Sequence, residues 1–240
     1  MTHLHIALWG VLPYLALAVL VAGTVWRYRY DRFGVTTRSS QLHESRMPRI
    51  GGPLFHHALF LVIGGPVTGL LVPETVTRRL RISEAQYHAV ALAMGGAAGV
   101  AAVTGLALLL YRGQRVPAVR RATSRSDRVT YPLLALVLLA GLTATASSVT
   151  TPYDYRLGVA VWFRSLFTLD PDVTAMAHAP LVHHMHPFLA LALFALWPFS
   201  RLVHAFAVPV GYAVRPYVVY RSRGRATGPG ARPVTARRRA

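Results

Sequence analysis

Residues 180–208 of this 240-residue chain read PLVHHMHPFLALALFALWPFSRLVHAFAV, an almost uninterrupted apolar stretch that carries four histidines. A helix of about 20 such residues crosses the hydrocarbon layer of a bilayer. Histidine is costly to leave unpaired in that layer, so histidines at this depth indicate a functional site. The stretch therefore predicts a membrane-spanning helix whose imidazoles bind another group.

Four further apolar stretches of similar length precede it, and the chain is 53% hydrophobic and 14% charged. A soluble domain usually carries about 25% charged residues, so this deficit is typical of a membrane protein. We predict an all-α integral membrane protein, with a bundle of five transmembrane helices in a domain of residues 1–220. The predicted spans are Ile6–Trp26, Pro53–Val72, His88–Leu110, Val129–Val149 and Pro180–Val208.

The basic residues, all of them arginine, predict the orientation of the chain. Of 26 arginines, 21 lie after the first span, after the third span or at the C-terminal end from Arg201 onward, and five lie in the other two connections. The positive-inside rule then places the N-terminus outside and the C-terminus in the cytoplasm. That arrangement needs an odd number of spans, as expected for a five-pass protein of a bacterial plasma membrane.

The net charge of +18 does not indicate nucleic-acid binding, because the arginines lie between long apolar stretches. Residues 221–240 are rich in Arg, Gly, Pro and Ala, which predicts a disordered, basic cytoplasmic tail. Such a tail either lies near anionic lipid headgroups or docks an acidic partner.

The absence of cysteine excludes several kinds of site. Disulfides, a thiolate nucleophile, c-type haem attachment and iron–sulfur ligation all need cysteine. No Asp or Glu falls inside any predicted span, which argues against proton pumping through a chain of carboxylates. Any cofactor must therefore be held chiefly by histidine.

The spacing of the histidines suggests a haem site. His186 and His204 are 18 residues apart, which in a continuous helix is five turns and roughly 27 Å. His56 begins a helix that runs outward, so it shares the cytoplasmic level of His204. Two imidazoles from facing helices are what a six-coordinate b haem needs, although a hydrogen bond across helices is the alternative. Arg201 would serve a haem propionate, or is an ordinary interfacial arginine.

Several short motifs resemble those of a known family, the gamma subunit of respiratory nitrate reductase, which is a membrane cytochrome b. The resemblance runs over nearly the whole chain to about Arg221. It is carried by Trp26-Arg27-Tyr28, Arg38-Ser39-Ser40-Gln41, Pro53-Leu54-Phe55-His56, Arg120-Arg121-Ala122-Thr123 and Pro198-Phe199-Ser200-Arg201-Leu202-Val203-His204, with His186 eighteen residues before the last of these.

The resemblance implies a role in a quinol:nitrate oxidoreductase. Members of the family oxidise quinol, such as menaquinol, at the outer side and release its protons there. Electrons pass through two b haems to an iron–sulfur beta subunit and then to a molybdenum alpha subunit that reduces nitrate. On this pattern His56 and His204 match the ligands of the inner haem iron, and His186 matches one ligand of the outer haem iron.

The chain departs from the family at the outer haem. The family's second outer ligand falls on Pro66, which has no ligating side chain and is expected to disrupt the helix. The lysine of the family's quinol site is also absent from the start of the third span. Three arrangements stay open: no outer haem, a five-coordinate haem on His186, or a substitute ligand, of which His88 is the best placed.

Two other functions remain open from the sequence. One is a cytochrome b subunit of another quinone-linked oxidoreductase. The other is a haem-free membrane anchor or transporter whose histidines only bridge helices.

Overall fold

Five helices of the computed structural model are long and apolar enough to cross a membrane. The structure describes residues 3–31, 46–151 and 153–205, and these are helical without a strand. The predicted tail 221–240 and the domain boundary at residue 220 lie outside this part. The long helices are α2 (Leu12–Tyr30), α3 (Arg46–Leu71), α5 (Glu84–Arg115), α7 (Arg125–Ser147) and α9 (Leu181–Leu196). The prediction of an all-α, five-span membrane protein is confirmed.

Short helices join the long ones at both ends. At the N-terminus, α1 (His3–Ile6) and a π-helical turn η1 (Ala7–Val11) run directly into α2. The other connections contain α4 (Glu74–Arg79), α6 (Pro117–Ala122), α8 (Val159–Ser165) and the 3-10 turns η3 (Leu166–Thr168) and η4 (Val173–Met176). A capping box starts each of two long helices, Ser83 with Gln86 at α5 and Ser124 with Asp127 at α7.

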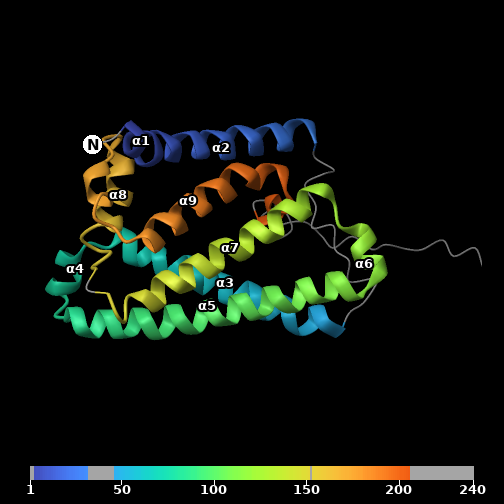
Figure 1. Ribbon diagram of the computed structural model, residues 1–240, viewed down its shortest axis with the longest axis horizontal. Coiled ribbons are helices and arrows are strands. Elements are labelled where there is room, and N and C mark those ends of the chain that lie inside the picture. The colour runs from blue at the N-terminus through green and yellow to red at the C-terminus, as the bar shows by residue number, and fades with distance from the viewer. Residues whose placement is uncertain (1–2, 32–45, 152, 206–240) are drawn as a thin grey trace, which may run out of the picture. The chain divides into compact units, whose positions relative to one another are not determined.

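The long helices pack in the order α3, α5, α7, α9 and α2, each against the next (Figure 1). The main buried cluster joins four of them: Phe55 and Ala58 of α3, Ala102 and Leu106 of α5, Leu134 and Leu138 of α7, and Leu193 of α9. A second cluster of Trp9, Trp162 and Met176 holds η1, α8 and η4 together. The second and fifth spans, which are predicted to carry the haem ligands, therefore contribute to one core through α3 and α9.

The contact between α3 and α5 depends on a glycine. A Cβ atom added at Gly105 would lie 2.7 Å from the backbone nitrogen of Phe55 and 2.8 Å from its Cα. Small residues permit such a close approach of two helix backbones in a membrane. Gly105 therefore sets the distance between α5 and the part of α3 that precedes His56.

The fifth predicted span differs from the structure. α9 ends at Leu196 and is followed by the 3-10 turn η5 (Trp197–Phe199), an extended Ser200, and the 3-10 turn η6 (Arg201–Ala205). Pro198 has no backbone N–H to donate to the carbonyl oxygen of Phe194, which accepts a bond from the N–H of Trp197 instead. The expectation of five continuous helical turns between His186 and His204 is therefore wrong.

The second span also differs from expectation, because α3 continues through Pro66 from Arg46 to Leu71. The Thr68 hydroxyl donates to the carbonyls of Gly64 and Gly65, at 3.1 and 2.7 Å. Such local side-chain bonds can satisfy backbone groups around a proline in a membrane helix. Pro66 thus removes a ligating side chain without ending the helix.

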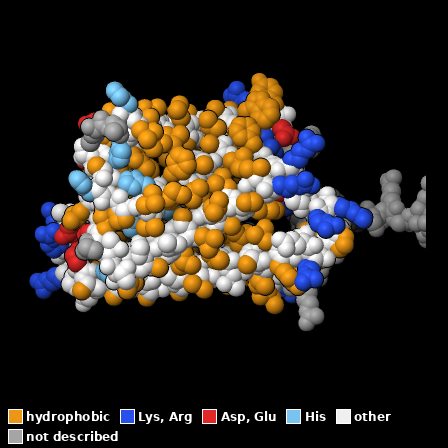
Figure 2. Space-filling view, viewed as in Figure 1, with side chains coloured by type: hydrophobic (Ala, Val, Ile, Leu, Met, Phe, Trp, Pro, Cys, Tyr) orange, Lys and Arg blue, Asp and Glu red, His pale blue; other side chains and the backbone are white. Residues whose placement is uncertain are grey.

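Hydrophobic side chains cover the middle of the molecular face drawn in Figure 2, and arginines gather toward its ends. We call the end where α2 ends and α3 begins the arginine-rich end; it includes α6 and the start of α7. The opposite end carries α1, α4 and α8 (Figure 1). This separation of an apolar middle from charged ends is what a bilayer requires.

The orientation gives a direct prediction, which the absence of cysteine makes simple to check. Thr75 on α4 and Ala118 on α6 are both exposed and lie at opposite ends. A Thr75→Cys variant should react with a membrane-impermeant maleimide in intact cells, and an Ala118→Cys variant only after permeabilisation. The reverse pattern would overturn the assignment of the arginine-rich end to the cytoplasm.

Candidate functional site

His56 lies on the first half of α3, one residue after the buried Phe55. Its Nδ1 lies 2.7 Å from the carbonyl oxygen of Gly52, to which it donates as the Nδ1–H tautomer. An imidazole held in this way presents the lone pair of Nε2, which is the usual arrangement of a histidine that binds a metal. The side chain is exposed in the protein alone, so its outer nitrogen is accessible to a bound group.

His204 is held in the same manner but on a different kind of element. It lies in the 3-10 turn η6, and its Nδ1 is 2.5 Å from the carbonyl oxygen of Arg201. Its Nε2 is therefore also the nitrogen available for a ligand. The turn itself is anchored by Val203, which is 1% exposed.

The segments that carry the two histidines pack against one core. Phe55, the neighbour of His56, belongs to the buried cluster against which Leu202 and Trp197 pack. Leu202 lies two residues before His204. That the two histidines share one level, and that they bind haem, both stay predictions.

Arg201, the predicted propionate partner, already has a carboxylate partner in this structure. Its Nε and Nη2 donate to the two oxygens of Asp127, at 2.8 and 2.6 Å. Asp127 is 1% exposed and lies in the first turn of α7. Asp127 lies before the predicted span Val129–Val149 but within α7, because this helix begins four residues before the predicted start of the span.

His186 lies on α9 and faces α7. Its Nδ1 is 3.1 Å from the carbonyl oxygen of Val137, and a Cβ atom added at Gly141 would lie 2.8 Å from its Cε1. The ring thus fits against α7 because residue 141 has no side chain. As at His56 and His204, Nε2 is the nitrogen left for a ligand.

The surroundings of Pro66 do not supply the missing outer ligand. Pro66 and its neighbours Gly64 and Gly65 are exposed. His88 is exposed near the start of α5, which packs against α3 and α7, whereas His186 lies on α9 and contacts α7. The two helices that carry His88 and His186 are thus separated by α7, and the proposed pairing of these histidines stays a prediction.

A polar cluster that sequence reasoning missed lies at the opposite end. The Arg156 side chain is 3% exposed and donates through Nη1 to both oxygens of Glu84, at 3.0 Å, and through Nη2 to Thr77. Its guanidinium lies 4.0 Å from the centre of the Tyr87 ring. The cluster joins α4, α5 and the connection before α8. Its only signal in the sequence is that Arg156 directly follows Tyr155 and that Glu84 lies three residues before Tyr87.

Two tyrosine hydroxyls complete this cluster. The hydroxyl oxygens of Tyr87 and Tyr155 are 2.9 Å apart and lie against Gly69 of α3. Burial raises the pKa of the Tyr155 hydroxyl, and its bond to Tyr87 acts in the same direction. The hydroxyl therefore stays protonated and able to donate.

Replacing Glu84 with glutamine tests how much this cluster stabilises the fold. The buried Arg156 would lose its charged partner, so we expect a loss of about 1 kcal/mol in the free energy of unfolding. The matched control is Glu74→Gln, whose partner Arg78 is 70% exposed, and a surface ion pair contributes little. Thermal unfolding in detergent measures both, and equal effects of the two variants would contradict the prediction.

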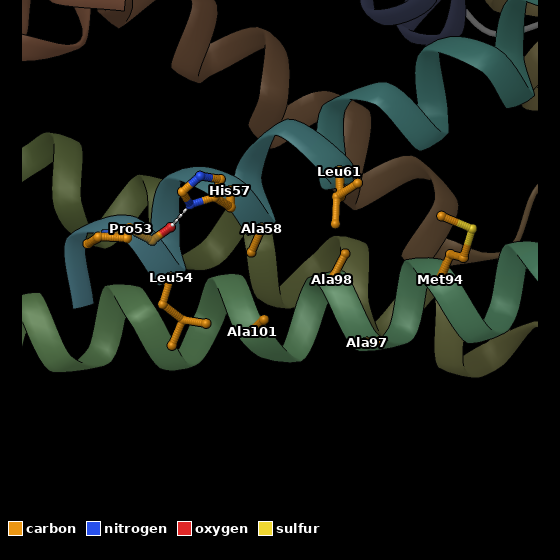
Figure 3. Close-up of a pocket in the computed structure, with 9 residues that line it drawn as sticks. All are labelled: Pro53, Leu54, His57, Ala58, Leu61, Met94, Ala97, Ala98 and Ala101. Atoms are coloured by element: carbon orange, nitrogen blue, oxygen red, sulfur yellow. Dashed lines mark hydrogen bonds between the residues drawn. The ribbon is translucent and has the colours of Figure 1, made fainter. Parts of the chain in front are cut away.

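An open groove of about 620 Å³ lies between α3 and α5. Figure 3 shows Leu54 and Ala58 of α3 directed toward Ala98 and Ala101 of α5. His57 borders the groove, and its Nδ1 is 2.7 Å from the carbonyl oxygen of Pro53. His57 thus has the same tautomer as His56 but belongs to an apolar groove, lined further by Leu61, Met94 and Ala97.

The fold and these side chains define a class, an integral membrane protein of five long helices with histidines whose Nδ1 atoms bond to backbone carbonyls. The sequence profile described as "Nitrate reductase gamma subunit" matches residues 5–223. The chain belongs to the nitrate reductase gamma subunit family.

Individual relatives agree with this assignment. A nitrate reductase-like protein NarX of Mycobacterium tuberculosis is 48% identical over 218 residues, which are 90% of this chain but 33% of that protein. The nitrate reductase gamma chain of Bacillus subtilis is 42% identical over 90% of this chain and 97% of its own length. The respiratory nitrate reductase 1 gamma chain of Escherichia coli is 29% identical over 93% of this chain and 100% of its own length. The chain thus spans about a third of the NarX protein and nearly all of the gamma chains.

Proposed function

We propose that this chain is the membrane-anchoring cytochrome b subunit of a quinol-oxidising respiratory nitrate reductase. It would oxidise quinol, with menaquinol among the candidates, and pass electrons through b haem to an iron–sulfur beta subunit that serves a molybdenum alpha subunit. The observation that carries the proposal is the pair His56 and His204. Each directs Nδ1 to a backbone carbonyl and keeps Nε2 for a ligand, on two elements of one core.

The donor set at this pair fits a b haem. The imidazoles of His56 and His204 would hold the haem iron, and the cluster that includes Phe55, with Leu202 and Trp197 packed against it, would supply apolar surface for the porphyrin. When bound, the haem supplies one-electron redox chemistry, while the protein supplies ligation, orientation and insulation. If Arg201 also binds a haem propionate, it would do so while keeping its two hydrogen bonds to Asp127.

The residues present do not complete a second site with two histidine ligands on the family's pattern, because Pro66 occupies the place of one of them. A quinol oxidised at the opposite end would then lack a relay through the bilayer. An outer haem would be ligated by His186 alone or by His186 together with His88.

The number of haems per polypeptide tests this proposal. We expect the detergent-purified complex to contain about one b haem per chain, measured by pyridine haemochrome against quantified protein, with a Soret band and a sharp alpha band on reduction. Two haems would support a surviving outer site, and His88→Ala would then identify its second ligand. No haem in a fully assembled complex would overturn the cytochrome proposal in favour of a haem-free anchor or transporter.

The partner subunit can be identified separately. The basic connections 27–49 and 112–128 should crosslink to a cytoplasmic iron–sulfur subunit. Co-purification of a molybdenum subunit would favour nitrate reductase, and its absence beside another dehydrogenase would favour a different quinone-linked complex.

A further inference from the structure

The segment that carries His204 leaves the path of α9 at Ser200, whose backbone is extended (φ −114°, ψ 175°). The Ser200 hydroxyl links the turns on either side, because it donates to the carbonyl oxygen of Trp197 and accepts from the backbone N–H of Leu202, at 2.9 and 3.1 Å. The first turn of α7 holds the segment at two further points. Ser126 donates from its hydroxyl to the carbonyl oxygen of Phe199 at 2.8 Å, and Asp127 accepts the two bonds from Arg201.

Asp127 is itself fixed in one orientation. Its Oδ2 accepts a hydrogen bond of 2.9 Å from the backbone N–H of Ser124, and its own N–H donates to the Ser124 hydroxyl at 3.1 Å. These two bonds form the capping box that starts α7. The carboxylate is 1% exposed, so it is at once the helix cap and the anchor of Arg201.

Arg201 connects this anchor to the histidine. Its guanidinium binds Asp127, and its carbonyl oxygen accepts the hydrogen bond from Nδ1 of His204. A continuous chain of bonds therefore runs from the capping box of α7 through Asp127 and Arg201 to the imidazole. A displacement of Arg201 would displace the atom that fixes the tautomer and the ring orientation of His204.

A contribution to stability alone does not account for this pair. A buried ion pair adds little net stability compared with apolar residues of the same size, because both charges lose their hydration. It does give a defined geometry, since a bidentate carboxylate–guanidinium pair allows only one arrangement of the two groups. The geometry that this pair defines is that of the turn carrying His204.

We propose that Asp127 is a positioning residue for His204, which it orients through Arg201 toward the inner haem iron. The inference rests on the proposed function, because it takes His204 to be a haem ligand. Asp127 does not touch the haem in this proposal. Asp127 instead sets the position of Nε2 of His204, through Arg201.

The test compares Asp127→Asn with Glu84→Gln in the full-length chain, purified with its partners. Each variant removes the carboxylate partner of an arginine in an ion pair with one buried member, Asp127 in the first pair and Arg156 in the second, but Glu84 lies at the opposite end of the molecule. Two properties are measured, the rate of haem loss to excess apomyoglobin and the low-spin ferric EPR g values. Removal of a group that orients a metal-binding histidine typically lowers metal affinity 10- to 100-fold. For Asp127→Asn we therefore expect haem loss that is faster by about tenfold or more, together with shifted g values. Glu84→Gln should change neither.

Two further variants separate position from stability. Asp127→Asn combined with Arg201→Met removes both charges, so we expect thermal stability to recover while haem loss stays fast. Asp127→Glu keeps the charge but lengthens the side chain, and should fold with shifted g values, which covers the case that the asparagine variant does not fold. Recovery of slow haem loss in the double variant, or equal behaviour of Asp127→Asn and Glu84→Gln, would overturn the positioning role. If the wild-type chain holds no haem that is lost when His56 is replaced, the proposed function is overturned as well.

Discussion

Replacing His56 with alanine should remove one b haem from each polypeptide and leave the bundle folded. The adjacent His57 borders the groove between α3 and α5, which His56 does not line, so we expect His57 not to replace it. The haem would then keep only one of its two histidine ligands and should be lost. Pyridine haemochrome content and the reduced alpha band measure the loss, and circular dichroism reports whether the helices remain.

The matched control is His57→Ala. His57 has the same Nδ1 bond to a carbonyl four residues before it, and it is exposed like its neighbour. We expect its removal to leave the haem content unchanged. If His57→Ala lost the haem and His56→Ala kept it, the ligand would be His57 and the rotation of α3 about its axis would be misassigned.

Replacing Gly105 with alanine should cause the largest loss of fold stability among the substitutions considered. The new methyl group would meet backbone atoms of Phe55 at 2.7 and 2.8 Å, and backbone cannot rotate away as a flexible side chain can. Overpacking of this kind costs about 3 kcal/mol when the neighbour is rigid. Because Phe55 precedes His56, the separation of α3 from α5 should also lower haem occupancy.

Gly96→Ala on the same helix is the control for this effect. No atom lies within 4 Å of a Cβ added there, and alanine favours a helix by roughly 0.5–1 kcal/mol over glycine. We therefore expect Gly96→Ala to raise the thermal midpoint slightly and Gly105→Ala to lower it by several degrees. Equal midpoints for the two variants would show that α3 and α5 can separate without cost.

The sequence predicted the five spans well, because apolar length is a direct consequence of bilayer thickness. It placed the helix ends less well. α7 begins at Arg125 rather than Val129 because the capping box of Ser124 and Asp127 adds a polar first turn that hydropathy does not register. This is also why the buried Asp127 escaped notice.

The candidate ligands could be predicted from spacing and resemblance, but the path of the chain between them could not. Pro198 is followed by the extended Ser200, whereas α3 continues through Pro66 to Leu71. The partners of Arg201 and Arg156 come from residues more than 70 positions away. Such pairings follow from helix packing, which a single sequence does not specify.

The break after α9 relates the site to the thickness of the bilayer. α9 has 16 residues, about 24 Å of helix, and the three residues of η5 add roughly 6 Å. Together they match the hydrocarbon layer of about 30 Å, so the chain leaves its helical path where the acyl chains give way to headgroups. The turn with Arg201 and His204 then lies at that boundary. A membrane of shorter acyl chains would hydrate it, and one of longer acyl chains would keep it dry.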